Sequence, residues 1–177
     1  MKKRKNTKIV LLVILFFLLI GFLLPESMVI PVQNATKDSW NHKTFWAHPW
    51  GRSVVHAGID IFASKGQPVI SATHGIVLFK GILKKGGNVL IILGPKWRLH
   101  YYAHLNEFRT GILKIVSQGD IIATVGKTGN AINTPAHLHY SIVTIFPYPW
   151  RWDKDKRGWL KMLFLDPGKE LLKNLKN

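Results

Sequence analysis

Residues 53–63 read SVVHAGIDIFA, a stretch in which apolar side chains alternate with polar or small ones. Because successive side chains of a β-strand point to opposite faces of a sheet, this alternation predicts a half-buried strand. The apolar face of that strand would carry Val55, Ala57, Ile59 and Ile61. The opposite face would carry His56, Gly58 and Asp60.

The same alternation returns in residues 136–146, AHLHYSIVTIF. The core face of this second strand would carry Leu138, Tyr140 and Ile142, and the opposite face His137, His139 and Ser141. Both strands thus present pairs of candidate metal ligands, and we expect Gly58 to leave room for an ion. The chain has no cysteine, so a metal must be held by His, Asp or Glu. Three ligands of the His, Asp and His type with an open fourth position are typical of a catalytic zinc site.

Further short runs rich in Val, Ile and Leu lie between these two stretches, separated by turns that contain glycine: PVISATHGIVLFKGIL (68–83), NVLIILG (88–94), RLHYYAHL (98–105) and DIIATVGKTG (120–129). This pattern predicts a mainly β fold, an antiparallel sheet of short strands folded on itself. A short helix is expected at the end, in PGKELLKNLKN (167–177). In RLHYYAHL, alternation would place His100, Tyr102 and His104 on one face.

The N-terminus combines a basic flank with an apolar run. MKKRKNTK (1–8) carries five positive charges, and IVLLVILFFLLIGFLL (9–24) follows directly. Sixteen helical residues reach roughly 24 Å, somewhat less than the roughly 30 Å hydrocarbon core of a bilayer. A signal peptide is the alternative, but its only plausible cleavage site, at Ala35, has Gln33 where a small residue belongs. We therefore expect an uncleaved single-pass anchor in the bacterial cytoplasmic membrane, with the rest of the chain on the extracytoplasmic side.

The charge of the chain bears on its partners. The 177 residues have 25 Lys and Arg against 9 Asp and Glu, a formal charge of +16. The part after the basic flank keeps 20 basic residues and all 9 acidic ones, a net +11. An exported protein seldom meets nucleic acid, so we expect anionic lipid headgroups or the cell wall as partners, and no nucleic acid.

Four motifs carry a resemblance to a known family: HAGID (56–60), YYAHL (101–105), GKTGNA (126–131) and PAHLHYSI (135–142). In this order they resemble the LytM/lysostaphin-type zinc metallopeptidases, which cut cell-wall peptides. The resemblance covers roughly residues 50–145. It implies one zinc ion per chain held by His56, Asp60 and His139, with His137 and His104 as catalytic histidines. The chain departs from the family at Ser141, where many members carry Glu.

The resemblance implies a zinc endopeptidase that hydrolyses stem or cross-link peptides of peptidoglycan. His137 would accept the proton of the attacking water and pass it to the leaving amine. His104 would either bind the developing oxyanion or orient the water. The alternative is a regulatory module that activates other wall hydrolases, although such relatives are expected to lack one or more ligands.

These features divide the chain into a flank and anchor (1–24), a linker and lead-in (25–45), a zinc metallopeptidase domain (46–145) and a C-terminal part (146–177). Segment 146–166 mixes Trp150, Trp152 and Trp159 with basic residues. This segment has two interpretations: a basic aromatic flap beside the membrane or the substrate groove, or a covering segment whose aromatic rings pack on the sheet. We expect no site role for His42, His48 and His74.

Overall fold

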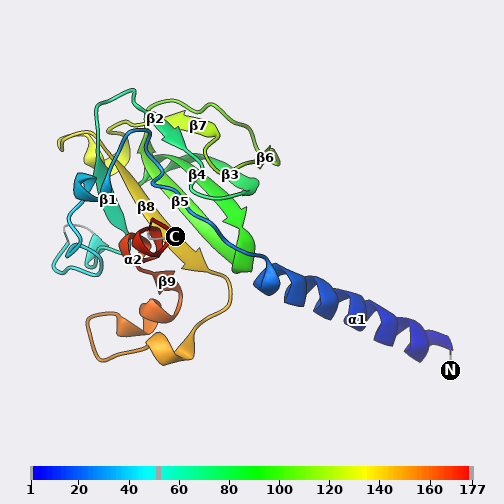
Figure 1. Ribbon diagram of the computed structural model, residues 1–177. Helices are drawn as coiled ribbons and strands as arrows, with labels where there is room; N and C mark the ends of the chain where they lie inside the picture. Colours follow the sequence, from blue (N-terminus) through cyan, green and yellow to red (C-terminus); the bar gives the residue numbers. More distant parts are fainter. Residues whose placement is uncertain (1, 51–52, 176–177) are drawn as a thin grey trace.

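The computed structural model describes residues 2–50 and 53–175 (Figure 1). Three parts of the predicted organisation lie outside these residues: the first residue of the basic flank, positions 51–52 of the predicted peptidase domain, and the last two positions of the C-terminal helix.

Most strands belong to one antiparallel sheet with the order β1-β8-β5-β4-β3-β6, in which β9 also pairs with β8. Its strands are β1 (Ile59–Phe62), β3 (Gly75–Leu83), β4 (Gly87–Gly94), β5 (Arg98–Leu105), β6 (Ile115–Val116), β8 (His137–Thr144) and β9 (Phe164–Leu165). A smaller sheet pairs β2 (Pro68–Ile70) with β7 (Ile121–Thr124). The predicted mainly β, antiparallel fold is therefore confirmed.

Helices are few in the described part of the chain. The α-helices are α1 (Lys2–Leu23) and α2 (Pro167–Asn174). Short 3-10 turns are η1 (Lys37–Ser39), η3 (Pro95–Trp97), η4 (Gly129–Ala131), η5 (Pro149–Arg151) and η6 (Gly158–Met162). The predicted C-terminal helix is confirmed as α2, which begins where the Asp166 side chain accepts a hydrogen bond from the Lys169 amide.

The core follows the alternation predicted for β8, whose Leu138, Tyr140 and Ile142 are fully buried. On β1, Ile59 and Ile61 are buried in the same cluster. β1 pairs with the first half of β8, and β5 pairs along the other edge of β8. The second face of β8 is thus flanked by β1 on one side and β5 on the other, and these strands supply the site described below.

A buried ion network ties the N-terminal segment and α2 to the sheet. The Arg98 guanidinium on β5 donates to the carboxylates of Glu26 and Glu170. His100, also on β5, is fully buried, and its Nδ1 lies 2.6 Å from the Tyr140 hydroxyl. His100 therefore belongs to the interior of the domain. The lead-in also packs on the domain, because Trp40 is buried.

The predicted membrane anchor is helical, but its membrane crossing is not supported. Among the residues that the structure describes, no helix is long and apolar enough to span a bilayer. The end of α1 packs against the domain: Trp97 Nε1 donates to the Leu18 carbonyl at 2.9 Å, and the Phe22 and Phe146 rings lie 5.1 Å apart.

Candidate metal centre

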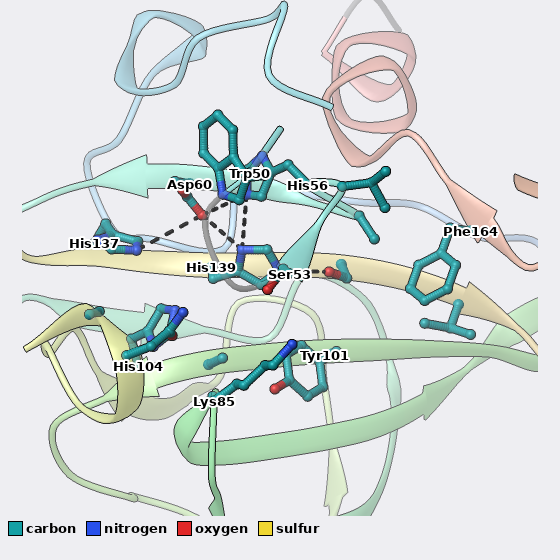
Figure 2. Close-up of a pocket in the computed structure, with 18 of the residues that line it drawn as sticks. Trp50, Ser53, His56, Asp60, Lys85, Tyr101, His104, His137, His139 and Phe164 are labelled. Carbon is teal, nitrogen blue, oxygen red and sulfur yellow. Dashed lines mark hydrogen bonds and ion pairs between the residues drawn. The ribbon is translucent and has the colours of Figure 1, made fainter. Parts of the chain in front are cut away.

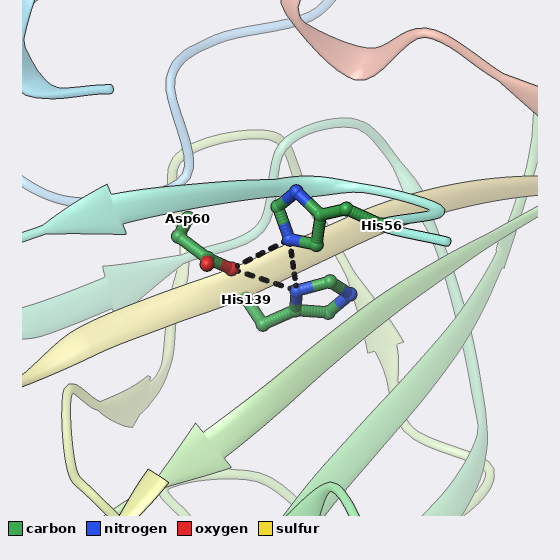
Figure 3. A group of neighbouring side chains, drawn as sticks. All are labelled: His56, Asp60 and His139. Atoms are coloured by element: carbon green, nitrogen blue, oxygen red, sulfur yellow. Dashed lines mark hydrogen bonds and ion pairs between the residues drawn. The ribbon is translucent and has the colours of Figure 1, made fainter. Parts of the chain in front are cut away.

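Three side chains converge on one point at the edge of the β1–β8 pair (Figure 3). Asp60 Oδ1 lies 3.0 Å from His56 Nε2 and 2.8 Å from His139 Nδ1. The two imidazole nitrogens lie 3.2 Å from each other. The structure thus brings together the three residues that the sequence suggested as metal ligands.

The spacing of these atoms suits a zinc ion. Ligands about 2.0–2.1 Å from a tetrahedral ion lie about 3.3 Å from one another, close to the three separations found here. Two nitrogens and one carboxylate oxygen are also donors that zinc favours. The donor set therefore fits zinc, and three protein ligands would leave room for a water on such an ion.

Hydrogen bonds on the outer side of each imidazole orient its inner nitrogen toward the ion site. His56 Nδ1 donates to the Thr44 carbonyl at 3.0 Å, which leaves the Nε2 lone pair facing Asp60. His139 Nε2 lies 3.0 Å from the Ser141 hydroxyl, which can accept its proton and so leave the Nδ1 lone pair facing inward. Such outer partners fix the tautomer and the ring orientation of a metal ligand. Thr44 of the lead-in and Ser141 thus help to orient the two imidazoles. Sequence patterns did not indicate these two contacts.

Only two of the three candidate ligands lie on strands. Asp60 on β1 is the direct cross-strand partner of His139 on β8. His56 lies before β1 begins, so the predicted strand over residues 53–63 is too long at its N-terminal end. The rings of His56 and Trp50 stack with their centres 4.2 Å apart. This stacking and the Thr44 contact hold the His56 side chain, which does not lie on a strand.

The expected role of Gly58 is wrong in detail. A Cβ at this position would lie 2.5 Å from Ser141 Oγ, 2.6 Å from the Tyr140 carbonyl oxygen and 2.8 Å from His139 Nε2. The absence of a side chain at Gly58 therefore makes room for the outer nitrogen of His139 and for its Ser141 partner, and not for the ion itself. Strand alternation alone could not show which atoms fill it.

The carboxylate of the trio is held in its charged form. Burial raises the pKa of Asp60, but the close contacts of its carboxylate with the His139 and His56 imidazoles outweigh burial and bring that pKa well below its ordinary value. Burial lowers the pKa of His139, in the direction of the neutral imidazole. A charged carboxylate beside a neutral imidazole is the protonation state that a metal ion requires.

His137 lies on the same face of β8 as His139 and points into the same space (Figure 2). Its Nδ1 donates to the Pro135 carbonyl at 2.8 Å, so the Nε2 lone pair faces the trio, 3.9 Å from Asp60 Oδ1. His137 therefore lies close to the candidate metal position, but it does not belong to the group of converging ligand atoms. This is the position of a group that can accept a proton.

His104 reaches the site through an irregularity of β5. Between the pairs Leu90–Tyr102 and Asn88–Leu105, β5 has one residue more than β4, and His104 has a left-handed φ of 61°. The predicted common face of His100, Tyr102 and His104 is therefore wrong, because this bulge interrupts the alternation. His100 and Tyr102 point into the core, whereas His104 lines the cleft with its ring 5.0 Å from that of His137.

The GKTGNA motif positions His104. The Thr128 carbonyl accepts a hydrogen bond from His104 Nδ1 at 2.8 Å. The Thr128 hydroxyl accepts from the Asn88 amide and donates to the Leu105 carbonyl, bridging β4 and β5. Gly129, at φ +68°, packs directly on Gly87, where a side chain would collide with backbone. Burial and the neighbouring His139 lower the pKa of His104 to about 4, so its imidazole is neutral at pH 7.

All five candidate residues line one cleft of about 660 Å³, with further lining residues that the sequence did not single out (Figure 2). Tyr101 presents its ring edge to His139 at 6.2 Å, and Trp50 covers His56. Trp50 belongs to a run of aromatic residues over 40–50 (Trp40, Phe45, Trp46 and Trp50), and this run is the sequence signal that could have indicated it. Simple alternation places Tyr101 and His104 on opposite faces of β5. The bulge at His104 brings both residues to the same cleft, so alternation could not indicate Tyr101.

The C-terminal part contributes a wall of this cleft through Arg157, Leu160 and Phe164. The prediction that segment 146–166 lies beside a groove is thus consistent with the structure. Trp150, Trp152 and Trp159 are more than half exposed, so these rings do not cover the sheet. His42, His48 and His74 are not among the lining residues of this cleft.

Replacing Ser141 by alanine is expected to weaken zinc binding about 10–100-fold, because His139 loses the acceptor that orients its ring. Competition with a chromophoric chelator measures this affinity, and circular dichroism checks the fold. Ser64→Ala, at an exposed serine before β2, is the matched control. Unchanged affinity in the Ser141→Ala variant would show that His139 does not depend on this hydrogen bond.

Comparisons with known proteins agree with this geometry. The family model described as Peptidase family M23 matches residues 54–147. The chain is 36% identical over 115 residues to the L-Ala–D-Glu endopeptidase of Bacillus subtilis (strain 168), a match that covers 60% of this chain and 35% of that protein. It is also 36% identical over 101 residues to the murein hydrolase activator NlpD of Escherichia coli (strain K12), covering 56% of this chain and 25% of that one.

Among solved structures, the catalytic domain of the antimicrobial peptidase lysostaphin from Staphylococcus simulans superposes with a TM-score of 0.61 at 22% identity. The match covers 77% of this chain and 95% of that domain, and it shows that the two share a fold. The chain spans only about a third or less of the two curated relatives above.

Proposed function

The chain belongs to peptidase family M23, and from this premise we propose that it is a zinc-dependent endopeptidase that hydrolyses peptide bonds of bacterial peptidoglycan. The observation that carries the proposal is the complete set of side chains around one cleft: His56, Asp60 and His139 in ligand geometry, with His137 and His104 beside them. The similarity to an L-Ala–D-Glu endopeptidase supports the substrate class.

In the proposed mechanism, His56 Nε2, Asp60 Oδ1 and His139 Nδ1 hold the zinc ion. A bound zinc ion acts as a Lewis acid, which lowers the pKa of a coordinated water to about 7 and polarises the carbonyl of the bond to be cleaved. His137 Nε2 accepts the proton of the attacking water and then donates it to the leaving amine. Its Nδ1 contact with Pro135 keeps this lone pair pointed into the cleft during both transfers.

The structure favours one of the two roles considered for His104. Because its Nδ1 donates to the Thr128 carbonyl, the neutral ring offers a lone pair at Nε2 and has no proton there for an oxyanion. We therefore propose that His104 accepts a hydrogen bond from the attacking water and orients it.

Purified sacculi incubated with the zinc-loaded protein are expected to release soluble peptides, which mass spectrometry identifies by their new termini. Removal of zinc with a chelator is expected to stop the release, and added zinc to restore it. Because peptidoglycan lies outside the cytoplasmic membrane, the proposal also requires export, which a phosphatase fusion at the C-terminus tests. Absence of released fragments from any wall type by the zinc-loaded protein would contradict the proposal.

A regulatory role is the second candidate, favoured by the similarity to a murein hydrolase activator. A regulator would bind a partner hydrolase and raise its activity without releasing fragments by itself. The complete ligand set argues against this candidate, because a purely regulatory module has no use for a metal centre of this geometry. Fragment release that requires an added hydrolase, and that does not depend on His137, would favour the regulator.

A further inference from the structure

The charges around the cleft point to the substrates that it would accept. Within the described residues, Asp60 is the only acidic side chain that lines the cleft, and it is committed to the two histidines of the metal centre. Two cationic side chains, Lys85 and Arg157, also line the cleft. With a divalent ion in place the cleft is strongly positive, and an anionic ligand would be drawn to it.

We propose that this cleft selects peptides that carry a free carboxylate beside the bond to be cleaved, recognised by Lys85 and Arg157. The inference rests on the proposed endopeptidase function and adds the substrate class. Peptidoglycan stem peptides carry such carboxylates, whereas a glycine cross-bridge carries none between its peptide bonds. The cleft is therefore assigned to stem peptides whose carboxylates are not amidated.

Lys85 approaches the metal centre from the turn between β3 and β4. Figure 2 shows its side chain in the cleft beside Tyr101, across from His139. Its backbone is held, because its carbonyl accepts a hydrogen bond from the Asn130 amide at 2.9 Å and the next carbonyl, of Gly86, accepts from the His104 amide at 2.8 Å. The turn that carries this cation is thus built into the same framework that positions His104.

Arg157 stands on a different wall, in the turn between η5 and η6. The β9 strand that follows η6 pairs with Ile142 and Val143, past the ligand His139 along β8. The backbone around Arg157 is fixed by two hydrogen bonds: Trp46 Nε1 donates to the Lys156 carbonyl at 3.0 Å, and the Gly158 amide to the Asp155 carbonyl at 2.8 Å. A guanidinium can bind a carboxylate through two parallel hydrogen bonds, which makes Arg157 suited to this task.

The two cations therefore flank the metal centre from opposite walls, on held backbone. A peptide lying along β8 would pass between them, with its cleaved bond at the zinc position. A carboxylate on either side of that bond would meet a cation, and an amide at the same place would lose the charge-assisted part of the contact. Because the Lys85 and Arg157 side chains are exposed, salt screens their charges and weakens their attraction for a carboxylate.

The test uses two stem peptides of identical sequence that differ only at the D-glutamate α-carboxyl group, free in one and amidated in the other. With the zinc-loaded full-length protein, kcat/KM is expected to be about tenfold higher for the acidic peptide, the value of one charge-assisted hydrogen bond. Lys85→Met or Arg157→Gln is expected to reduce this ratio toward one, and 0.5 M salt to lower it in the wild-type protein.

Matched controls are Lys84→Met, in the same turn as Lys85, and Lys154→Gln, in the same segment as Arg157, since neither residue lines the cleft. Both controls are expected to keep the wild-type ratio, and zinc content is measured for every variant. Equal rates on the two peptides in the wild-type protein would overturn the inference while leaving the endopeptidase function intact. A preference that survives in the Lys85→Met, Arg157→Gln double variant would also overturn it. Absence of hydrolysis of both peptides and of sacculi would contradict the proposed function itself.

Discussion

Replacement of His139 by alanine is expected to abolish stoichiometric zinc binding and to lower peptidoglycan hydrolysis by roughly a thousandfold or more, because several kcal/mol of transition-state stabilisation depend on the ion. His139 Nδ1 is close to both other candidate ligands, 2.8 Å from Asp60 Oδ1 and 3.2 Å from His56 Nε2. Without it, two ligands remain, and the Asp60 carboxylate loses its nearer partner. Zinc content after dialysis and release of peptides from sacculi measure the two effects.

His74→Ala is the control for this experiment. His74 is exposed, and its Nδ1 accepts a hydrogen bond from the Gln118 amide at 3.4 Å, away from the cleft. This variant is expected to keep one equivalent of zinc and full hydrolysis. If the His139→Ala variant also kept both, the metal centre proposed here would be wrong.

Replacement of His137 by alanine is expected to lower kcat about 10²–10⁴-fold, the usual contribution of a general acid–base group, while zinc remains bound. The reason is geometric: His137 Nε2 faces the cleft 3.9 Å from Asp60 Oδ1, near the trio but outside the set of converging ligand atoms. Steady-state kinetics on a stem peptide, together with zinc content, separate loss of proton transfer from loss of metal.

Chemical rescue sharpens this second experiment. The alanine variant leaves space beside the metal centre, so added imidazole is expected to restore part of the lost kcat in the His137→Ala protein. The same addition should leave His139→Ala inactive, since that variant lacks the ion. Loss of zinc from His137→Ala would contradict the assignment, because His137 would then be a ligand.

Strand alternation predicted much of the site because β8 is regular. Its core side chains are fully buried, and His137 and His139 share the opposite face as expected. Alternation failed where the backbone departs from a strand. His56 precedes β1 and is held by Thr44 and Trp50, and His104 enters the cleft only because a bulge reverses the side-chain direction on β5. Periodicity describes a regular backbone and carries no information about such local departures.

The membrane anchor shows a different limit. Hydropathy located the apolar run correctly in a helix, but within the described residues that helix is not long and apolar enough to cross a bilayer.

By itself the sequence determined the class of the protein: short glycine-separated strands, a cysteine-free set of possible ligands, and four ordered motifs that resemble one peptidase family. Only the tertiary structure decided which atoms meet. It placed His56 Nε2, Asp60 Oδ1 and His139 Nδ1 at ligand spacing, put Thr44, Ser141 and Thr128 beside the outer nitrogens of the imidazole rings, and brought Lys85 and Arg157 into the same cleft. The physical reason is that residue types and their spacing follow the order of the chain, whereas coordination and charge recognition depend on distances between segments that the fold alone brings together.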